Sequence, residues 1–225
     1  HIRADLAAVL HRQHGLLDAA RPEAVAKRKR HGKNTARENL EQLLDAGSFV
    51  EYGGLTLAMQ RSRRSEEELI RLSPADGTLS GLGMVNGQQF GSEQARCAVM
   101  AYDYTVFAGT QGFMAHRKMD RIVHTSERLG LPFILFAEGG GGRPGDTDYV
   151  GVSGLEFTTF THMARLSGKV PTVGIVSGRC FAGNAALLGC CDVIIATEDA
   201  SIGMAGPAMI EGGGLGVATA AEGGP

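Results

Sequence analysis

The sequence predicts an α/β protein with a mostly parallel sheet and flanking helices. Two short apolar runs, 133–137 and 173–176, each lead into a glycine cluster and then a helical pattern. This order is typical of a buried strand that feeds a loop and a helix. Units of strand, strand and helix recur along the chain, and long connections through helices favour parallel pairing. The 225 residues suffice to bury a substantial core.

Residues 1–32 are predicted to form an N-terminal helical segment. Apolar residues recur at helical spacing among charged and alanine residues over 2–20, which indicates an amphipathic helix. Pro22 interrupts this pattern, and the helix is expected to continue over 24–30.

A basic cluster ends this segment and contains Lys27–Arg30, His31 and Lys33. It is either a solvated helix face or a patch that faces phosphate groups. The formal net charge of the chain is −2, so bulk electrostatics favour neither nucleic acid nor an acidic membrane as a partner.

A capping box predicts where the next helix begins. Thr35 stands at the N-cap position, and Glu38 is placed to reach back to it. Leucines follow at helical spacing, and Gly47 stands where a glycine commonly ends a helix. Residues 49–52 then predict a short strand.

Three features are expected between residues 61 and 90. The charged run 61–71 predicts an exposed helix or loop, and 73–77 predicts a linker. Asn86-Gly87 between apolar residues predicts a tight hairpin over 81–90.

The middle of the chain predicts a strand, a loop, a helix and a second strand. The strand covers 97–101, and the loop 103–110 follows it. An apolar stripe indicates a helix over 112–128 that ends at Gly130, and the next strand begins at Phe133.

The last third of the chain repeats this arrangement. It predicts a helix over 152–166, a strand over 170–176, a glycine loop over 178–184, a short helix over 185–188, and strands over 192–196 and 200–204. No apolar run approaches about 18 residues, so no membrane span is expected. No signal-peptide core is recognisable, and we expect a cytoplasmic protein.

The cysteine and histidine patterns predict no metal site. The four cysteines contain no C-x-x-C pair, so buried free thiols in a reducing compartment are expected. His116, His124 and His162 stand in helical patterns without a metal-ligand spacing, which favours packing or surface roles.

The two glycine clusters carry the chemical prediction. Glycine at a strand exit lets successive backbone N–H groups turn outward without a Cβ in the way. Such groups at a helix start bind anions and polarise carbonyl oxygens. Two clusters one structural unit apart therefore predict donors that converge on one developing oxyanion, although tight turns alone would also use glycine.

Several stretches together have a specific order and spacing. They are Thr35-Ala-Arg-Glu38, Leu43-Leu-Asp-Ala-Gly-Ser-Phe-Val50, Asp103-Tyr-Thr-Val-Phe-Ala-Gly109, the two glycine clusters and Ala182-Gly-Asn184. They resemble the N-terminal half of a biotin-dependent acyl-CoA carboxyltransferase, the β-subunit family of propionyl-, methylcrotonyl- and acetyl-CoA carboxylases. The resemblance covers residues 33–216, nearly the whole chain.

The resemblance implies the crotonase (ClpP-like) fold, built of repeated ββα units. It implies that residues 33–225 form the first of two such domains, with the C-terminal carboxyltransferase domain absent from this sequence. The implied reaction moves a carboxyl group from carboxybiotin, on a separate carrier domain, to the α-carbon of an acyl-CoA. Biotin carboxyl carrier and biotin carboxylase components would be partners, and the full enzyme would be a homo-oligomer.

The resemblance also implies two oxyanion holes made of backbone N–H groups. The candidates are Gly141 and Gly142 for one hole, and Ala182 and Gly183 for the other. Which hole serves the thioester and which serves biotin stays open. Each hole would contribute about 3–4 kcal/mol to stabilising the transition state.

Six further residues are candidate substrate contacts. Lys33, Arg37 and Lys118 are candidates for the CoA phosphates, on charge and position. Gly140, Arg143 and Asn184 flank the proposed donors. Arg143 has an alternative role, which is to lock its loop by pairing with Glu138 or Asp146.

The first glycine loop departs from the family pattern. It has one more glycine than usual, and Pro144 follows the arginine where many members carry Ile-Gln. This departure leaves the assignment to propionyl- or acetyl-CoA open. A crotonase-family hydratase, isomerase or decarboxylase without biotin is an alternative, with Glu138 the only obvious carboxylate nearby. A non-catalytic CoA-binding or assembly module is a second alternative.

Overall fold

A computed structural model describes residues 2–148 and 157–224. Within them, a six-stranded sheet has the order β1-β2-β3-β4-β5-β7. The strands are β1 (Val50–Tyr52), β2 (Thr78–Met84), β3 (Arg96–Tyr102), β4 (Phe133–Phe136), β5 (Thr172–Val176) and β7 (Val193–Ala196). β1, β2 and β3 pair antiparallel, and β3, β4, β5 and β7 pair parallel. β6 (Arg179–Phe181) and β8 (Ser201–Gly203) form a small parallel sheet of their own.

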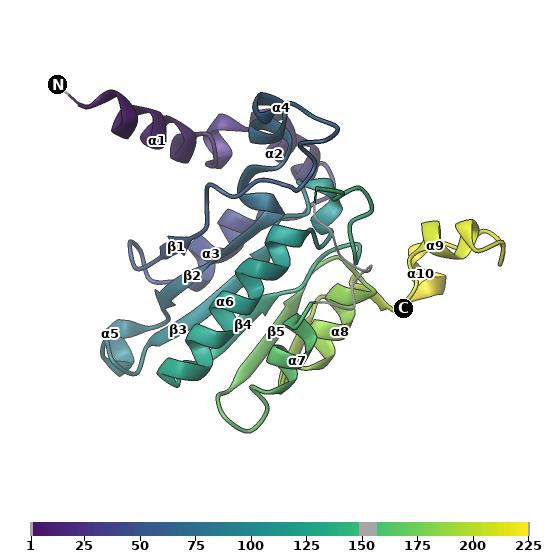
Figure 1. The fold of residues 1–225 in the computed structure, drawn as a ribbon. Coiled ribbons are helices and arrows are strands. Elements are labelled where there is room, and N and C mark those ends of the chain that lie inside the picture. The colour runs from purple at the N-terminus through teal and green to yellow at the C-terminus, as the bar shows by residue number, and fades with distance from the viewer. Residues whose placement is uncertain (1, 149–156, 225) are drawn as a thin grey trace.

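Alternating side chains of β3 separate two hydrophobic clusters. Met100 and Tyr102 belong to the larger cluster, together with buried residues of α6 (Phe113–Leu129). Val99 and Ala101 belong to the second cluster, which α3 (Ala36–Leu43) covers. Because successive side chains of a strand point to opposite faces, β3 in the middle of the sheet is covered on both sides (Figure 1).

The remaining helices are short. They are α1 (Ala4–His14), η1 (Asp18–Ala20), α2 (Pro22–Lys29), α4 (Glu66–Leu72), η2 (Pro74–Gly77), α5 (Gly87–Phe90), η3 (Phe107–Gly109), α7 (Thr159–Ala164), α8 (Gly183–Gly189), α9 (Pro207–Gly212) and α10 (Ala220–Gly223). α1 projects away from the sheet and has no buried residue (Figure 1). The predicted N-terminal helices are thus present, with a break before Pro22.

The capping box of Thr35 and Glu38 is confirmed at the start of α3. The role expected for Gly47 is wrong, because α3 ends at Leu43 and Gly47 lies in the following turn with a φ of 74°. Predicted strands at 49–52, 97–101, 133–136, 170–176, 192–196 and 200–204 are confirmed within one or two residues at most ends.

Asn86 and Gly87 do not form the predicted tight hairpin. β2 and β3 pair antiparallel, but residues 85–95 connect them and include the short helix α5. The Asp45 carboxylate accepts hydrogen bonds from the N–H groups of Asn86 at 3.0 Å and Gly87 at 2.7 Å. This tertiary contact holds a helix start where the dipeptide alone favours a turn.

Residues 73–77 are not a linker, because η2 is buried. Ala75 and Asp76 adopt φ angles of 52° and 50°, in the left-handed region. Lys118 Nζ donates to Ala75 O at 2.9 Å, and the Asp76 carboxylate accepts from Ala115 N–H at 2.8 Å. Buried partners therefore hold a segment whose composition resembles that of a loop.

Two predictions for the last third need correction. The helix predicted over 152–166 is the shorter α7 within the described residues, and its predicted start at 152–156 lies outside them. The predicted loop 178–184 contains strand β6, and α8 already begins at Gly183.

Candidate functional site

Two glycine loops lie against each other at the ends of β4 and β5. We call residues 139–145 the first loop and residues 178–184 the second loop. Gly139 N–H donates to Arg179 O at 2.8 Å, and Phe181 N–H donates to Gly139 O at 2.9 Å. This pair of bonds joins the two loops edge to edge.

Gln111 holds the other edge of the first loop. Its N–H donates to Gly141 O at 2.7 Å, and its C=O accepts from Arg143 N–H at 2.9 Å. Gly142 lies opposite Gln111 in this parallel bridge. In such a bridge the middle residue directs its own N–H to the opposite side. Among the described residues, nothing accepts a hydrogen bond from Gly142 N–H.

Two of the four predicted oxyanion donors are already engaged. Gly141 N–H donates to Asn184 Oδ1 at 2.9 Å. Ala182 N–H donates to Gly203 O at 2.9 Å. These two N–H groups are therefore not available to a ligand in this arrangement. An oxyanion bound at the loops would need other N–H donors.

Gly183 begins α8, and its N–H has no acceptor among the described residues. A Cβ at Gly183 would lie 2.1 Å from Gln111 Oε1 and 3.3 Å from Phe160 Cζ. The Gly183 nitrogen lies 3.6 Å from the position of a Cβ on Gly141, which places the start of α8 beside the first loop. Gly142 and Gly183 are therefore the donors that the geometry leaves open.

Asn184 and Gly140 have structural partners. The fully buried Asn184 carboxamide accepts from Gly141 N–H and donates from Nδ2 to Gly109 O at 3.3 Å. Gly140 N–H donates to Ala108 O at 3.1 Å. Asn184 thus braces both loops, and its predicted contact with substrate is replaced by a contact with Gly141.

Arg143 locks the first loop and does not face a ligand. Its side chain is 3% exposed and forms an ion pair with Asp76. Nη2 also donates to Thr110 O at 2.9 Å, and Nη1 lies 3.6 Å from Asp146 Oδ2. The guanidinium carbon lies 4.9 Å from the centre of the Phe107 ring. The alternative of a loop-locking arginine is therefore correct, with Asp76 as its main partner in place of Glu138.

Arg37 and Lys118 are bound by groups inside the protein. The Arg37 guanidinium donates to Leu16 O at 2.8 Å and to Glu51 Oε2 at 3.1 Å. Lys118 Nζ is buried on the carbonyl oxygens of Ala75 and Thr78. Burial lowers the pKa of Lys118 to about 8. Both residues stabilise the fold, so their predicted contact with CoA is not supported by their position.

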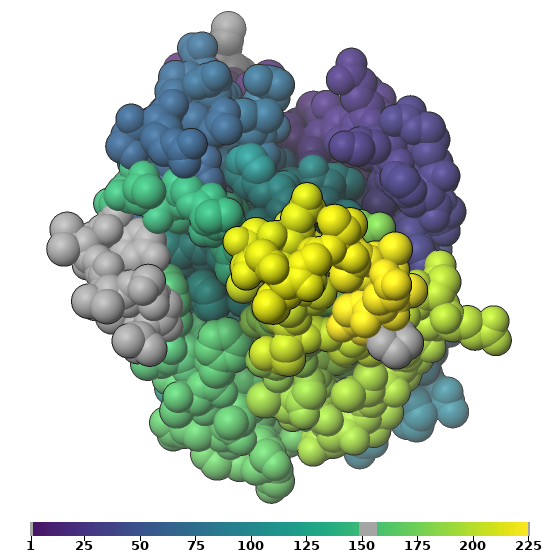
Figure 2. All heavy atoms as spheres, turned by 90° about the vertical axis from the view of Figure 1, so that its right-hand side faces the viewer, coloured from purple at the N-terminus to yellow at the C-terminus, as the bar shows by residue number. Residues whose placement is uncertain are grey.

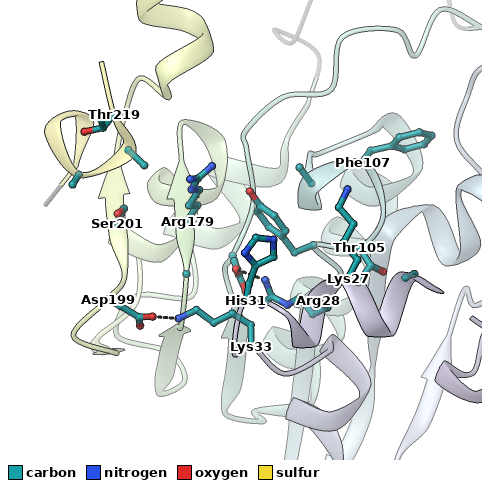
Figure 3. A pocket seen from close by; sticks show the side chains of 17 residues that line it. Lys27, Arg28, His31, Lys33, Thr105, Phe107, Arg179, Asp199, Ser201 and Thr219 are labelled. Carbon is teal, nitrogen blue, oxygen red and sulfur yellow. Dashed lines mark hydrogen bonds and ion pairs between the residues drawn. The ribbon is translucent and has the colours of Figure 1, made fainter. Parts of the chain in front are cut away.

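Lys33, in contrast, lines a pocket of about 750 Å³. The wall includes Lys27, Arg28, His31 and Arg179, with Ser201 and Thr219 beside them (Figure 3). Lys33 Nζ donates to Asp199 Oδ2 at 2.5 Å. Residues between 24 and 33 line this pocket together with residues 219–221. Figure 2 shows the face of the molecule on which the C-terminal segment, in yellow, lies.

The pocket carries a surplus of positive charge. Lys27, His31 and Arg179 have no carboxylate partner among the described residues. The sequence pointed to Lys27, His31 and Lys33 as a basic cluster. It did not point to Arg179, because only the packing of β6 brings this residue beside α2.

Glu138 also lines the pocket. Arg28 Nη1 donates to its Oε1 at 2.9 Å, and Arg28 Nη2 donates to its Oε2. Both side chains are buried, and the Arg28 guanidinium also lies 5.3 Å from the centre of the Tyr104 ring. A carboxylate with both oxygens bound by a guanidinium is poorly placed to act as a general base.

Neither a reactive cysteine thiolate nor a set of metal ligands is found among the described residues. Burial raises the pKa of Cys180 to about 12, so its thiol is neutral near pH 7. Across residues 2–148 and 157–224, no three His, Cys, Asp or Glu side chains gather into a set that would hold a metal ion. None of the helices in these ranges offers the apolar length that a bilayer crossing requires.

The chain belongs to the carboxyl transferase domain family, whose sequence model matches residues 27–222. It is 32% identical to the propionyl-CoA carboxylase beta chain of Saccharopolyspora erythraea over 79% of this chain and 30% of that protein. Identity is also 32% to the biotin-dependent long chain acyl-coenzyme A carboxylase beta4 subunit of Mycobacterium tuberculosis, over 79% of this chain and 31% of that subunit. The chain thus spans about a third of the length of these curated relatives.

Solved structures agree with this assignment. A single-chain, multi-domain long-chain acyl-CoA carboxylase superposes with a TM-score of 0.94 at 60% identity, covering all of this chain and 22% of that one. The hexameric transcarboxylase 12S superposes with a TM-score of 0.70 at 29% identity, over 90% of this chain and 37% of that one. The predicted crotonase-like fold with a mostly parallel sheet is confirmed.

Proposed function

We propose that this chain is the N-terminal domain of the carboxyltransferase of a biotin-dependent acyl-CoA carboxylase. It would move a carboxyl group from carboxybiotin to the α-carbon of an acyl-CoA. The observation that carries the proposal is the pair of open N–H groups, Gly142 and Gly183, on two adjoining loops of a carboxyl transferase family member. Identity of 60% to a long-chain acyl-CoA carboxylase supports a long acyl chain.

The chemistry requires charge stabilisation more than titratable side chains. When the acyl thioester loses its α-proton, negative charge moves to the thioester oxygen. Fixed N–H donors that face this oxygen stabilise the enolate without reorganising. Carboxybiotin, when bound, would supply the carboxyl group as CO₂ and leave a biotin nitrogen able to take the α-proton, and the α-carbon of the enolate would then bond to that CO₂. The chain's own part is to hold the Gly142 and Gly183 N–H groups in place.

The basic pocket is the proposed site for the CoA phosphates. Lys27, His31 and Arg179 face it without carboxylate partners among the described residues, and Lys33 lines it. Phosphate oxygens are strong acceptors for charge-assisted hydrogen bonds from such groups. The pocket is bounded by Glu138 and Gly178, at the bases of the first and second loops. A CoA held there would direct its thioester end toward Gly142 and Gly183.

Glu138 argues against the alternative of a hydratase. A hydratase needs a carboxylate that activates water near the donors, and both Glu138 oxygens are bound by Arg28. The alternative of a CoA-binding module without turnover predicts the same pocket but no dependence of carboxyl transfer on Gly183.

Further protein is proposed to complete the site. β7 forms an edge of the sheet, and Val193, Ile194 and Ile195 are 52%, 47% and 54% exposed. Exposed apolar side chains on an edge strand are typical of a surface that another part of an assembly covers. The C-terminal carboxyltransferase domain, biotin carboxyl carrier, biotin carboxylase and further copies of the chain are the proposed partners, in the cytoplasm.

Calorimetry with two ligands tests the phosphate pocket. Acyl-CoA is compared with the acyl-pantetheine thioester, which lacks the nucleotide phosphates. Lys27→Ala and Arg179→Ala should each weaken acyl-CoA binding about 3- to 10-fold, since each removes a charge-assisted contact, and should leave acyl-pantetheine unchanged. Arg30→Ala, on the same basic run but outside the pocket lining, is the matched control. Equal affinity of all variants for acyl-CoA would contradict the proposed pocket.

Transfer activity tests the reaction itself. The chain, combined with a C-terminal carboxyltransferase domain, should transfer carboxyl from a carboxyacyl-CoA to free biotin, which is the reverse reaction. The isolated chain should show little or no transfer. Hydration of an enoyl-CoA with no biotin-dependent transfer would instead establish the hydratase alternative.

A further inference from the structure

Gln111 places an unusual polar group between the two loops. The residue is 4% exposed, and its Nε2 donates to the Tyr102 hydroxyl at 3.0 Å. No group of the described residues donates a hydrogen bond to its Oε1. Among these residues, His162 Nδ1 is the one fully buried side-chain N or O atom without a hydrogen-bond partner, so Gln111 Oε1 keeps some access to solvent. Oε1 is therefore the end of the carboxamide that a ligand can reach.

The free end of this carboxamide faces the start of α8. Gln111 Oε1 lies 2.1 Å from the position that a Cβ on Gly183 would take, and Cδ lies 3.0 Å from it. The backbone of Gln111 at the same time pairs with Gly141 and Arg143 on either side of Gly142. Gln111 thus lies next to Gly142 through its backbone and next to Gly183 through its side chain.

The Tyr102 hydroxyl allows the carboxamide to reverse. A phenol hydroxyl both donates and accepts hydrogen bonds, so it serves Oε1 as well as Nε2. After a half turn, Oε1 accepts from Tyr102 O–H, and Nε2 faces the space beside Gly183. Burial raises the pKa of Tyr102 well above its usual range, so the hydroxyl keeps its proton in both orientations.

We propose that Gln111 is a third hydrogen-bond donor of the transfer site, whose Nε2 contacts the thioester oxygen beside Gly142 and Gly183. The inference rests on the proposed carboxyl transfer. Gln111 exchanges no proton in this step: the α-C–H bond breaks, the charge moves to the oxygen, and the Nε2–H group stabilises it.

Two substitutions of similar size separate this role from packing. Gln111→Met removes the hydrogen-bonding head group, and Gln111→Glu replaces the amide with a carboxyl group. Both are assayed in the chain combined with the C-terminal domain, by biotin-dependent transfer between pH 6 and pH 9. Gln111→Met should lower kcat about 100-fold with KM changed less than about threefold, because the contact strengthens only as charge develops.

Gln111→Glu should depend on pH where the wild type does not. An ionised carboxylate repels the enolate, whereas a protonated one donates a hydrogen bond like the amide. The ratio of variant to wild-type kcat should therefore rise about tenfold as the pH falls from 9 to 6. Tyr102→Phe removes the anchor of the carboxamide and should cost about 3- to 10-fold in kcat. Gln89→Glu, on the exposed helix α5, is the matched control.

The outcomes distinguish the two proposals. Wild-type kcat in Gln111→Met overturns the third donor and leaves the proposed function intact. Equal, pH-independent losses in the Met and Glu variants, with lowered melting temperatures, mean that Gln111 only fills space, which also overturns it. Absence of transfer in the wild-type combination overturns the proposed function, and the inference falls with it.

Discussion

The two glycine loops use glycine for different reasons. In the first loop, Gly141 has a φ of 86°, and its N–H and C=O are both bonded inside the protein. In the second loop, Gly183 has no positive φ, and glycine is required there because Gln111 and Phe160 occupy the space of a side chain. The first loop is held by a buried ion pair, the second by packing. A glycine run therefore marks a possible donor site, but local pairing decides which N–H groups stay open.

The largest expected effect tests the crowding at the second loop. Gly183→Val would force side-chain atoms into Gln111 and Phe160, so the start of α8 must shift. Biotin-dependent transfer should fall more than about 1000-fold, since both the donor position and the acyl space are lost. Steady-state kinetics of the combined domains measures this.

Gly189→Ala is the matched control for this substitution. It lies at the other end of α8, where nothing lies within 4 Å of an added Cβ. Alanine there should leave transfer unchanged and should stabilise the chain by up to about 1 kcal/mol. Comparable activity of Gly183→Val and Gly189→Ala would show that the second loop does not require glycine at position 183.

The ion pair of the first loop gives the next effect. Arg143→Met leaves Asp76 buried without its partner, which should lower the free energy of unfolding by about 3–5 kcal/mol. Urea denaturation measures the loss. Arg179→Met, an arginine of the second loop that has no carboxylate partner among the described residues, should change this free energy by less than about 0.5 kcal/mol. Equal losses in both variants would show that the two loops do not differ in this respect.

Acid should loosen the packing beside the second loop. His116 lies 6.1 Å from Phe160 between ring centres, and burial lowers the pKa of His116 from 6.5 to about 4. Between these two pH values the unfolded chain binds the proton and the folded chain does not, so stability is lost as the pH falls from 6.5 to 4. The contribution is on the order of 2–3 kcal/mol.

Unfolding free energies of wild type and His116→Gln across this pH range measure the effect. The variant should lose less stability toward pH 4 than the wild type does. His124→Gln, an exposed histidine of the same helix, should keep the wild-type slope. An unchanged slope in His116→Gln would assign the acid sensitivity to other groups.

The smallest effect compares adjacent glycines of the first loop. Gly141→Ala combines a φ of 86° with a Cβ placed 2.6 Å from Ala182 Cβ, and should cost about 1–3 kcal/mol of stability. Gly142→Ala meets nothing within 4 Å and should cost less than about 0.5 kcal/mol. Thermal unfolding of both variants measures this. A larger loss for Gly142→Ala than for Gly141→Ala would contradict the assigned backbone roles.

Local sequence determined most of the elements of this protein. The capping box of Thr35 and Glu38, the stripe of α6 and its end at Gly130 depend on neighbouring residues, so they could be predicted from the chain. The buried strands could be predicted for the same reason. The order of the motifs also determined the family, because it combines many weak local signals into one specific pattern.

Tertiary structure decided where local preference competes with distant partners. Asp45 turns the Asn86-Gly87 dipeptide into a helix start, and Lys118 helps to hold η2. The same holds for the site: Asn184 takes up the N–H of Gly141, and packing of β6 adds Arg179 to the basic pocket. A backbone N–H is open only when nothing folds against it, and residues far along the chain decide this. Sequence therefore located the two loops, and only the fold selected Gly142 and Gly183 within them.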